Sequence, residues 1–167
     1  MTYHRFEKIC PKNNIYIVTS AVYKDLVKQQ LKGIEDDRII CEPTRRNTAP
    51  CIAYANFRIL NQNPQANIIV APSDHLILKE DKFIDIINKA LDVAKDNDIL
   101  ITLGIKPSYP NTGYGYIQYY RVASLQSDNN FKKVKLFTEK PNLEMAQMFI
   151  DSGDFLWNAG IFVWSLN

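Results

Sequence analysis

Short apolar runs alternate along this chain with segments of helical spacing. Residues 15–18 and 38–41 are short runs rich in β-branched side chains. Residues 67–71 form the strongest run, which is apolar from Ile68 onward, and residues 99–103 form another. A continuous apolar run of this kind is typical of a strand that is buried on both faces of a parallel sheet. We therefore expect a strand at each of these places.

The segments between the apolar runs have the period of a helix. From Phe83 to Ala94, apolar residues recur at steps of three and four, which predicts an amphipathic helix over residues 80–97. Residues 21–31 and about 47–60 also predict helices. Strand, helix, strand, helix in this order predicts an α/β fold with a parallel sheet covered by helices.

After Lys106 the pattern changes to that of antiparallel strands. Residues 116–122 and 132–138 are expected to be extended and joined by a polar turn over 124–130. A short helix around 143–151 and a last strand over 160–164 follow. The sequence has no internal repeat and no linker, so we interpret residues 1–167 as one domain with a mixed, mostly parallel sheet.

The first expected strand comes after a polar lead-in that ends near Asn14. A doubly wound α/β domain normally opens with a strand and a ligand-binding loop, and no such unit is visible in this sequence. We therefore interpret residues 1–167 as a partial domain that lacks its first strand. Because an exposed sheet edge invites pairing with another chain, self-association into a homo-oligomer is also expected.

Composition excludes several classes of protein. The chain has 167 residues, is 46% hydrophobic and 23% charged, and carries a formal net charge of +2, which argues against a nucleic-acid or membrane-surface partner. The three cysteines are odd in number and match no zinc spacing, so free thiols are expected. There is no apolar run of signal-peptide or membrane-spanning length. These features favour a cytoplasmic protein.

Two segments that follow expected strands can carry chemistry. Asp74 and His75 come after the strongest strand, where α/β proteins bind ligands, and a carboxylate there can hold a divalent cation. Alternatively, Asp74 caps the next turn and His75 is a hydrogen-bonded structural residue. Residues 42–50 lie between a strand and a helix that Asn47 or Thr48 can cap, with Pro50 in its first turn.

The 42–50 segment can bind an anion. Backbone amides at a helix N-terminus attract negative charge, and Arg45 and Arg46 add positive charge there. Glu42 can instead accept hydrogen bonds from a purine base. A capped surface loop is the other interpretation.

Three later segments are candidates for ligand contacts. Gly115 lies in a segment whose glycines precede a strand, which rejects a dinucleotide fingerprint but allows either a close ligand approach or a tight turn. Glu139 can accept sugar hydroxyls and Lys140 can neutralise a phosphate, provided that the chain bends near Pro141; otherwise the two form a surface pair. Asn158 offers both a donor and an acceptor, beside a Trp157 that is expected in the core.

The order of these segments resembles the mannose-1-phosphate guanylyltransferase family of sugar-1-phosphate nucleotidyltransferases. The motifs are Glu-Pro-x-x-Arg-Asn-Thr-Ala-Pro from Glu42, Pro-Ser-Asp-His from Pro72, Gly-Ile-x-Pro-x-x-Pro-x-Thr-Gly-Tyr-Gly-Tyr-Ile from Gly104, Glu-Lys-Pro from Glu139 and Trp-Asn-x-Gly-Ile-Phe from Trp157. The resemblance runs from about Ile15 to Leu166. It implies a Rossmann-like nucleotidyltransferase fold and the transfer of GMP from GTP to mannose 1-phosphate, giving GDP-mannose and pyrophosphate with Mg²⁺.

The resemblance also implies roles for individual residues. Asp74 would be a catalytic magnesium ligand and Lys140 would meet the sugar phosphate. The remaining expected contacts fall into two groups, a nucleotide group of Glu42, Arg46, Asn47 and Thr48 and a sugar group of Gly115, Glu139 and Asn158.

The chain also departs from the family pattern. The glycine-rich opening loop, which holds the triphosphate, and a second magnesium carboxylate are not found within it, and Arg45 stands where a small residue is expected. We therefore expect the chain by itself to have little or no activity. Alternatives that stay open are a non-catalytic module that binds a nucleotide or a sugar phosphate, the same reaction with another sugar or base, and a purely structural domain.

Overall fold

The computed structural model describes residues 2–44, 47–124 and 130–166. The chain divides into two compact units, one of residues 1–101 with 163–167 and the other of residues 102–162. We call these the first and the second unit. Whether they make one domain, as the sequence suggests, stays a prediction.

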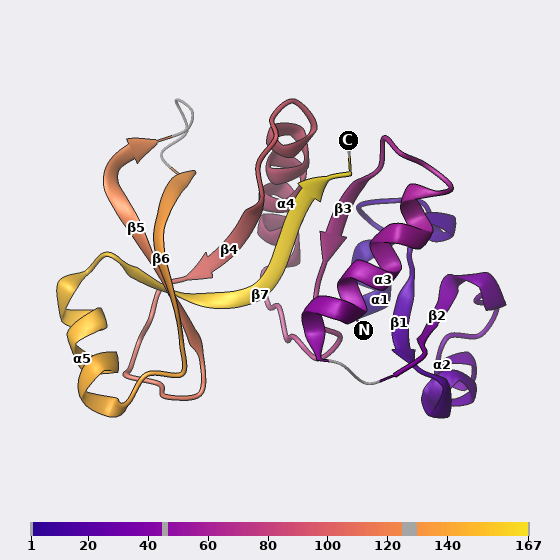
Figure 1. Cartoon of the computed structure of the whole chain (residues 1–167), viewed down its shortest axis with the longest axis horizontal. Coiled ribbons are helices and arrows are strands. Elements are labelled where there is room, and N and C mark those ends of the chain that lie inside the picture. The colour runs from indigo at the N-terminus through magenta and orange to yellow at the C-terminus, as the bar shows by residue number, and fades with distance from the viewer. Residues whose placement is uncertain (1, 45–46, 125–129, 167) are drawn as a thin grey trace. The chain divides into compact units, whose positions relative to one another are not determined.

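The helices and strands are shown in Figure 1. In chain order they are α1 (Thr2–Phe6), β1 (Ile17–Ser20), α2 (Lys24–Gln30), β2 (Ile39–Glu42), α3 (Thr48–Leu60), β3 (Asn67–Val70), α4 (Glu80–Lys95), β4 (Ile101–Ile105), β5 (Gly115–Ser124), β6 (Lys132–Glu139), α5 (Leu143–Ser152) and β7 (Phe155–Ser165). Short 3-10 helices occupy Lys12–Asn14, Ala21–Tyr23 and Asp36–Arg38.

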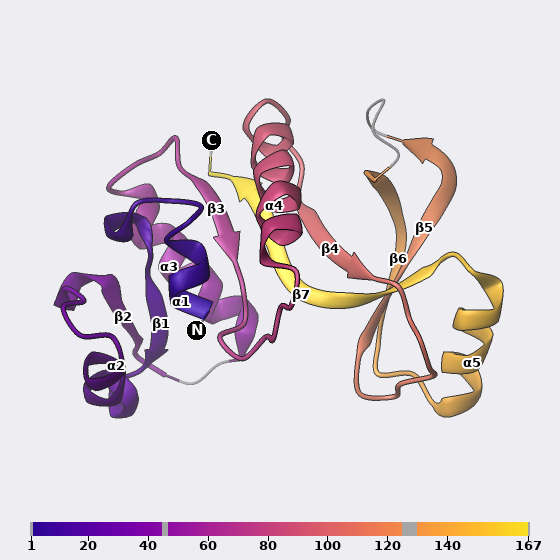
Figure 2. The ribbon, with the colours of Figure 1, turned by 180° about the vertical axis from the view of Figure 1, so that it is seen from behind.

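The first unit contains a two-stranded parallel sheet of β1 and β2 (Figure 2). Ile17 pairs with Ile39 and Ser20 pairs with Glu42, so both strands end at the same edge. The helix α3 packs on this pair. β3 belongs to a second sheet with the order β3-β7-β5-β6, in which β4 also pairs with β7. The parallel pair and its helices confirm the predicted α/β class, whereas the missing first strand stays a prediction.

Helix α4 shows why the periodicity was informative. Its apolar face is buried at Phe83, Ile87, Ala90 and Ala94, and it packs against β3. The helix ends at Lys95, slightly before the predicted end. The Asn97 side chain donates to the backbone oxygen of Val93 at 2.8 Å, which satisfies a carbonyl of the last turn.

The second unit is built on antiparallel β5 and β6, as predicted, with β7 pairing antiparallel to β5. The core is a cluster of Tyr116, Ala146, Phe155 and Trp157, and Phe149 stacks on Phe155 with 4.1 Å between ring centroids. β7 begins at Phe155 rather than at the predicted residue 160. The predicted start was wrong because residues 155–157 pair with β5, a long-range contact that places them in the sheet.

The lead-in contains the helix α1, which the sequence analysis did not anticipate. Phe6 packs edge-on against Phe83, with 6.1 Å between ring centroids, and Arg5 is only 5% exposed. The short, polar helix α1 is therefore held in position by packing against Phe83 of α4. The three cysteines are free, as expected. In the described part of the chain, every helix is too short or too polar to cross a bilayer.

Candidate active site

Gly115, Glu139 and Asn158 come together in the second unit. Gly115 and Glu139 are Cα partners across β5 and β6. A Cβ atom built on Gly115 would lie 2.7 Å from Glu139 Oε2 and 3.5 Å from Asn158 Cβ. The two polar side chains therefore flank the place where Gly115 has no side chain. The structure thus brings the three predicted sugar-binding residues together at one point of the sheet.

The amide of Asn158 is held by two hydrogen bonds. Its Oδ1 atom accepts from the backbone N–H of Gly160 at 3.0 Å and from Thr102 Oγ1, on β4, at 3.2 Å. Gly160 has a φ of 66°, a left-handed conformation in which glycine carries no steric penalty. The half-buried Asn158 side chain is thus anchored on the strand β7, whereas Glu139 is exposed.

Lys140 marks the bend that the sequence analysis required near Pro141. Its φ of 47° is left-handed, and its backbone N–H donates to the Tyr114 oxygen at 3.2 Å. Pro141 is buried just after it. The bend ends β6 at Glu139, so the strict alternation of a strand does not apply to Lys140. Adjacent Glu139 and Lys140 can therefore serve one ligand.

Aromatic residues support this part of the second unit. Trp157 is buried, as expected for a core residue, and the rings of Tyr109 and Tyr114 meet it edge-on at 5.1 and 5.2 Å. The segment before Gly115 is closed by the Asn111 side chain, which accepts from the Gly113 N–H at 2.7 Å. The glycine segment is therefore a tight turn that leads into β5 at Gly115.

In the first unit, the predicted nucleotide residues lie at the end of β2 and the start of α3. Glu42 is the last residue of β2 and is half-buried, while Asn47 and Thr48 are exposed. Asn47 occupies the N-cap position, yet its side chain forms no capping hydrogen bond. Burial and the negative charge of Glu42 raise the pKa of the Cys51 thiol. Arg45 and Arg46 lie outside the described residues.

Asn47 also has an unusual backbone, with φ 67° and ψ −172°. This region is populated almost only by glycine, and strained residues of this kind gather at functional sites. Among the described residues, Asn47 and Lys140 are the non-glycine residues with positive φ, and both were predicted from the sequence to bind a ligand.

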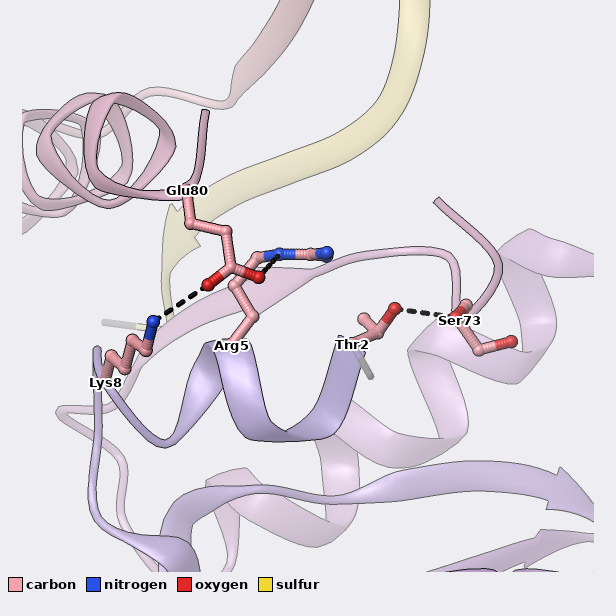
Figure 3. Close-up of polar contacts among 5 residues, drawn as sticks. All are labelled: Thr2, Arg5, Lys8, Ser73 and Glu80. Carbon is pink, nitrogen blue, oxygen red and sulfur yellow. Dashed lines mark hydrogen bonds and ion pairs between the residues drawn. The ribbon is translucent and has the colours of Figure 1, made fainter. Parts of the chain in front are cut away.

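Asp74 lies in the connection between β3 and α4. Its carboxylate is exposed and forms no hydrogen bond or ion pair with a described residue, so the capping alternative gains no support. The residue before it is tied to α1, because Thr2 Oγ1 donates to the Ser73 oxygen at 2.7 Å (Figure 3). His75 is half-buried in the same connection.

The far end of this connection is tied to α1 as well. Glu80, at the start of α4, accepts from Lys8 Nζ at 2.8 Å and from Arg5 Nε at 3.3 Å (Figure 3). The hydrogen bond from Lys8, together with both positive charges, holds the pKa of the Glu80 carboxyl below its ordinary value. α1 therefore braces both ends of the segment that carries Asp74.

A magnesium ion would find one suitable ligand in Asp74. Within the described residues there is no group of three His, Cys, Asp or Glu side chains that could enclose a metal. Magnesium in phosphoryl-transfer sites needs only one or two carboxylates, because substrate phosphates and waters complete its octahedron. An exposed, unpaired carboxylate fits that kind of shared site and does not fit a closed protein cage.

Sequence reasoning missed Thr102 and the α1 contacts of Thr2 and Arg5. Thr102 sits within an ordinary strand pattern, and its importance depends on which residue of β7 lies beside it. The recurrence of Tyr3, Phe6 and Cys10 at helical spacing was the available signal for α1. The ion pair between Arg5 of this helix and Glu80 joins positions far apart in the sequence, so no local sequence pattern predicts it.

Comparison with known proteins gives a consistent picture. The nucleotidyl transferase family matches residues 1–167. Mannose-1-phosphate guanylyltransferase 2 of Escherichia coli O157:H7 is 41% identical over 154 residues, covering 88% of this chain and 32% of that protein. A mannose-1-phosphate guanylyltransferase of Escherichia coli strain K12 is 35% identical over 164 residues, covering 93% and 34%. The chain spans about a third of the length of these curated relatives.

Solved structures share the fold. A structure described as mannose-1-phosphate geranyltransferase from Thermus thermophilus superposes with a TM-score of 0.86 at 23% identity, covering 99% of this chain and 46% of that one. A structure described as mannose-6-phosphate isomerase from Helicobacter pylori gives a TM-score of 0.80 at 28% identity, covering 99% and 60%. The first likeness, at this low identity, speaks for the fold alone.

Proposed function

Because the chain belongs to the nucleotidyl transferase family, we propose that it serves the transfer of GMP from GTP to mannose 1-phosphate, giving GDP-mannose and pyrophosphate. The observation that carries this proposal is the grouping of Glu139 and Asn158 beside Gly115. A carboxylate and an amide that lie this close together can bind neighbouring hydroxyls of a hexose. The named guanylyltransferase relatives support mannose 1-phosphate as the sugar phosphate.

The proposed chemistry needs no strong general base. The attacking oxygen belongs to a sugar phosphate that is already ionised, so catalysis depends on positioning and on neutralising charge around phosphorus. Lys140 would supply a positive charge beside the sugar phosphate. Asp74 would hold a magnesium ion, which would add positive charge to the phosphate oxygens of the substrates.

The nucleotide would contact the first unit. Glu42 can accept hydrogen bonds from a guanine base, and Asn47 and Thr48 lie at the N-terminus of α3, where backbone N–H groups attract anions. The strained backbone of Asn47 favours this assignment. Arg46 completes the proposed set from the sequence.

Ligand binding tests each half of the proposal. Backbone amide resonances are followed by NMR while mannose 1-phosphate or GTP is titrated into the protein. Mannose 1-phosphate should shift the resonances of residues 115, 139 and 158, and GTP those of residues 42, 47 and 48. Glucose 1-phosphate and UTP are the matched comparison ligands. Absence of any response to mannose 1-phosphate in the second unit would contradict the proposal.

Catalysis separates an enzyme from a binding module. Formation of GDP-mannose is measured from GTP, mannose 1-phosphate and magnesium, using the protein in the form in which its cell makes it. Turnover supports the enzyme. Binding of both ligands without turnover would favour a non-catalytic module, and preferential use of another sugar 1-phosphate would reassign the substrate.

A further inference from the structure

We propose that Thr102 is a positioning residue of the sugar site. Its hydroxyl helps to fix the Asn158 amide so that Nδ2 donates to one sugar hydroxyl, while Glu139 accepts from another. The inference rests on the proposed function, because it concerns the same site. The inference adds Thr102, which does not itself touch the ligand, to the site. It also assigns Asn158 as a hydrogen-bond donor and Glu139 as a hydrogen-bond acceptor.

The orientation of the Asn158 amide follows from its partners. A backbone N–H can only donate, so the Asn158 atom that faces Gly160 at 3.0 Å must be the oxygen. The Thr102 hydroxyl can rotate to donate to the same oxygen at 3.2 Å. Both lone pairs of Oδ1 are then used within the protein. The Nδ2 group forms no hydrogen bond with a described residue and remains available to a ligand.

The neighbouring strands place this amide between two different surroundings. On one side of β7, Thr102 of β4 holds the amide oxygen. On the other side, β5 brings Gly115 beside Asn158 and β6 brings the Glu139 carboxylate beside Gly115. Glu139 has no hydrogen-bond partner among the described residues. The neighbourhood of Gly115 therefore presents a donor from β7 and an acceptor from β6.

The fixed donor of Asn158 and the acceptor of Glu139 restrict which hydroxyl of the ligand can bind at each position. The hydroxyl that meets Asn158 must accept a hydrogen bond, and the hydroxyl that meets Glu139 must donate one. Without the Thr102 hydroxyl, one lone pair of Oδ1 loses its partner and the amide is less firmly held. The expected result is weaker sugar binding, although Thr102 does not touch the sugar.

The test compares binding of mannose 1-phosphate to the wild type and three variants by calorimetry. Thr102→Val keeps the shape but removes the hydroxyl, and we expect about three- to ten-fold weaker binding. Thr102→Ser restores the hydroxyl and should bind within about two-fold of the wild type. Asn158→Ala should bind at least as weakly as Thr102→Val. GTP affinity should stay unchanged in all three variants.

Deoxy and deoxyfluoro analogues of mannose 1-phosphate give a readout that a merely structural role would not move. Fluorine can accept a weak hydrogen bond but cannot donate one. When the hydroxyl that meets Asn158 is replaced, the fluoro analogue should bind to the wild type more tightly than the deoxy analogue does. In Thr102→Val the two analogues should bind with equal affinity. At the position that meets Glu139, the two analogues should be equally poor.

The outcomes distinguish the inference from the function on which it rests. If Asn158→Ala binds mannose 1-phosphate normally, the proposed sugar site is wrong. If Asn158→Ala binds weakly but Thr102→Val binds normally, only the role of Thr102 is overturned. Equal weakening by Thr102→Val and Thr102→Ser would also overturn it, because the hydroxyl would not be the cause. Should Thr102→Val fail to fold, Thr102→Ala removes the same hydroxyl.

Discussion

Three predicted binding residues of the second unit, Gly115, Glu139 and Asn158, lie on paired strands, whereas Asn47 and Asp74 of the first unit lie on connections between a strand and a helix. Gly115 and Asn158 are held by the pairing of β5, β6 and β7, and Glu139 ends β6. In the first unit, Asn47, at the N-cap of α3, and Asp74 are exposed, and their side chains have no described hydrogen-bond partner.

This difference shows what the backbone can preorganise. Strand pairing fixes which side chains are neighbours, so Gly115, Glu139 and Asn158 lie together without a ligand. A carboxylate on an exposed connection depends on its loop and on its ligand for a final position. We therefore expect the first unit to respond chiefly to changes of charge and the second to changes of shape as well as charge.

The largest expected effect comes from Asp74→Asn. The variant keeps the size of the side chain but removes the charge that would hold magnesium, so in the intact protein, as its cell makes it, we expect magnesium-dependent turnover to fall by about a hundred-fold or more. The melting temperature should not change, since Asp74 is exposed and has no described partner. Asp98→Asn, at another exposed position, is the control. Near-normal turnover of Asp74→Asn would remove Asp74 from the site.

Lys140→Ala tests the charge of the second unit. We expect binding of mannose 1-phosphate to weaken by roughly ten- to a hundred-fold, because a charge-assisted contact contributes about 1.5–3 kcal/mol. The effect on GTP should be smaller. Steady-state kinetics with each substrate varied in turn measures both, and Lys135→Ala, an exposed lysine on β6, is the control. An equal effect on both substrates would contradict the assignment to the sugar phosphate.

Gly115→Ala tests whether the lack of a side chain at position 115 sets the place of the Glu139 carboxylate. The added Cβ would lie 2.7 Å from Glu139 Oε2, which is the end of a flexible side chain. The carboxylate can move aside at little cost in stability, but it then leaves its place beside Gly115 and Asn158. We expect mannose 1-phosphate to bind about ten-fold more weakly, as for the loss of one hydrogen bond to a charged group, while the melting temperature stays nearly constant.

A double variant sharpens this prediction. Glu139→Asp shortens the side chain and makes room for the Cβ at position 115. If displacement of the carboxylate is the cause, the effects of Gly115→Ala and Glu139→Asp on binding should not add. Additive effects, or a large loss of stability in Gly115→Ala, would show that displacement of the Glu139 carboxylate is not the cause of the weaker binding.

How far the sequence predicts the structure depends on how local each feature is. The periodic apolar residues of α4 located that helix because the signal lies within the helix itself. The motif order grouped Gly115, Glu139 and Asn158 as sugar contacts, and the structure places the three close together, while their role in binding stays a prediction. The contact between Thr102 and Asn158 depends on the register of β4 against β7, and α1 depends on Arg5 reaching Glu80. Neither contact has a pattern in the local sequence.

The smallest expected effect concerns the brace between α1 and the Asp74 connection. The pKa of Glu80 is lowered in the folded protein, first by the hydrogen bond from Lys8. A carboxyl whose folded pKa is depressed adds stability above its unfolded pKa of about 4.3, and this stability is lost as the pH falls through the folded value. The melting temperature of the wild type should therefore exceed that of Glu80→Gln at neutral pH, and the two should converge under acid.

Glu144→Gln is a close control for this last prediction. Glu144 and Glu80 both lie in the first turn of a helix, so both carboxylates interact with a helix N-terminus, but only Glu80 has described ion pairs. The pH-dependent difference should thus be larger for Glu80→Gln. Amide hydrogen exchange of residues 74–79 should also rise in Glu80→Gln, while exchange at residues 115, 139 and 158 stays unchanged. Equal exchange of residues 74–79 in the variant and the wild type would mean that α1 does not brace the Asp74 connection.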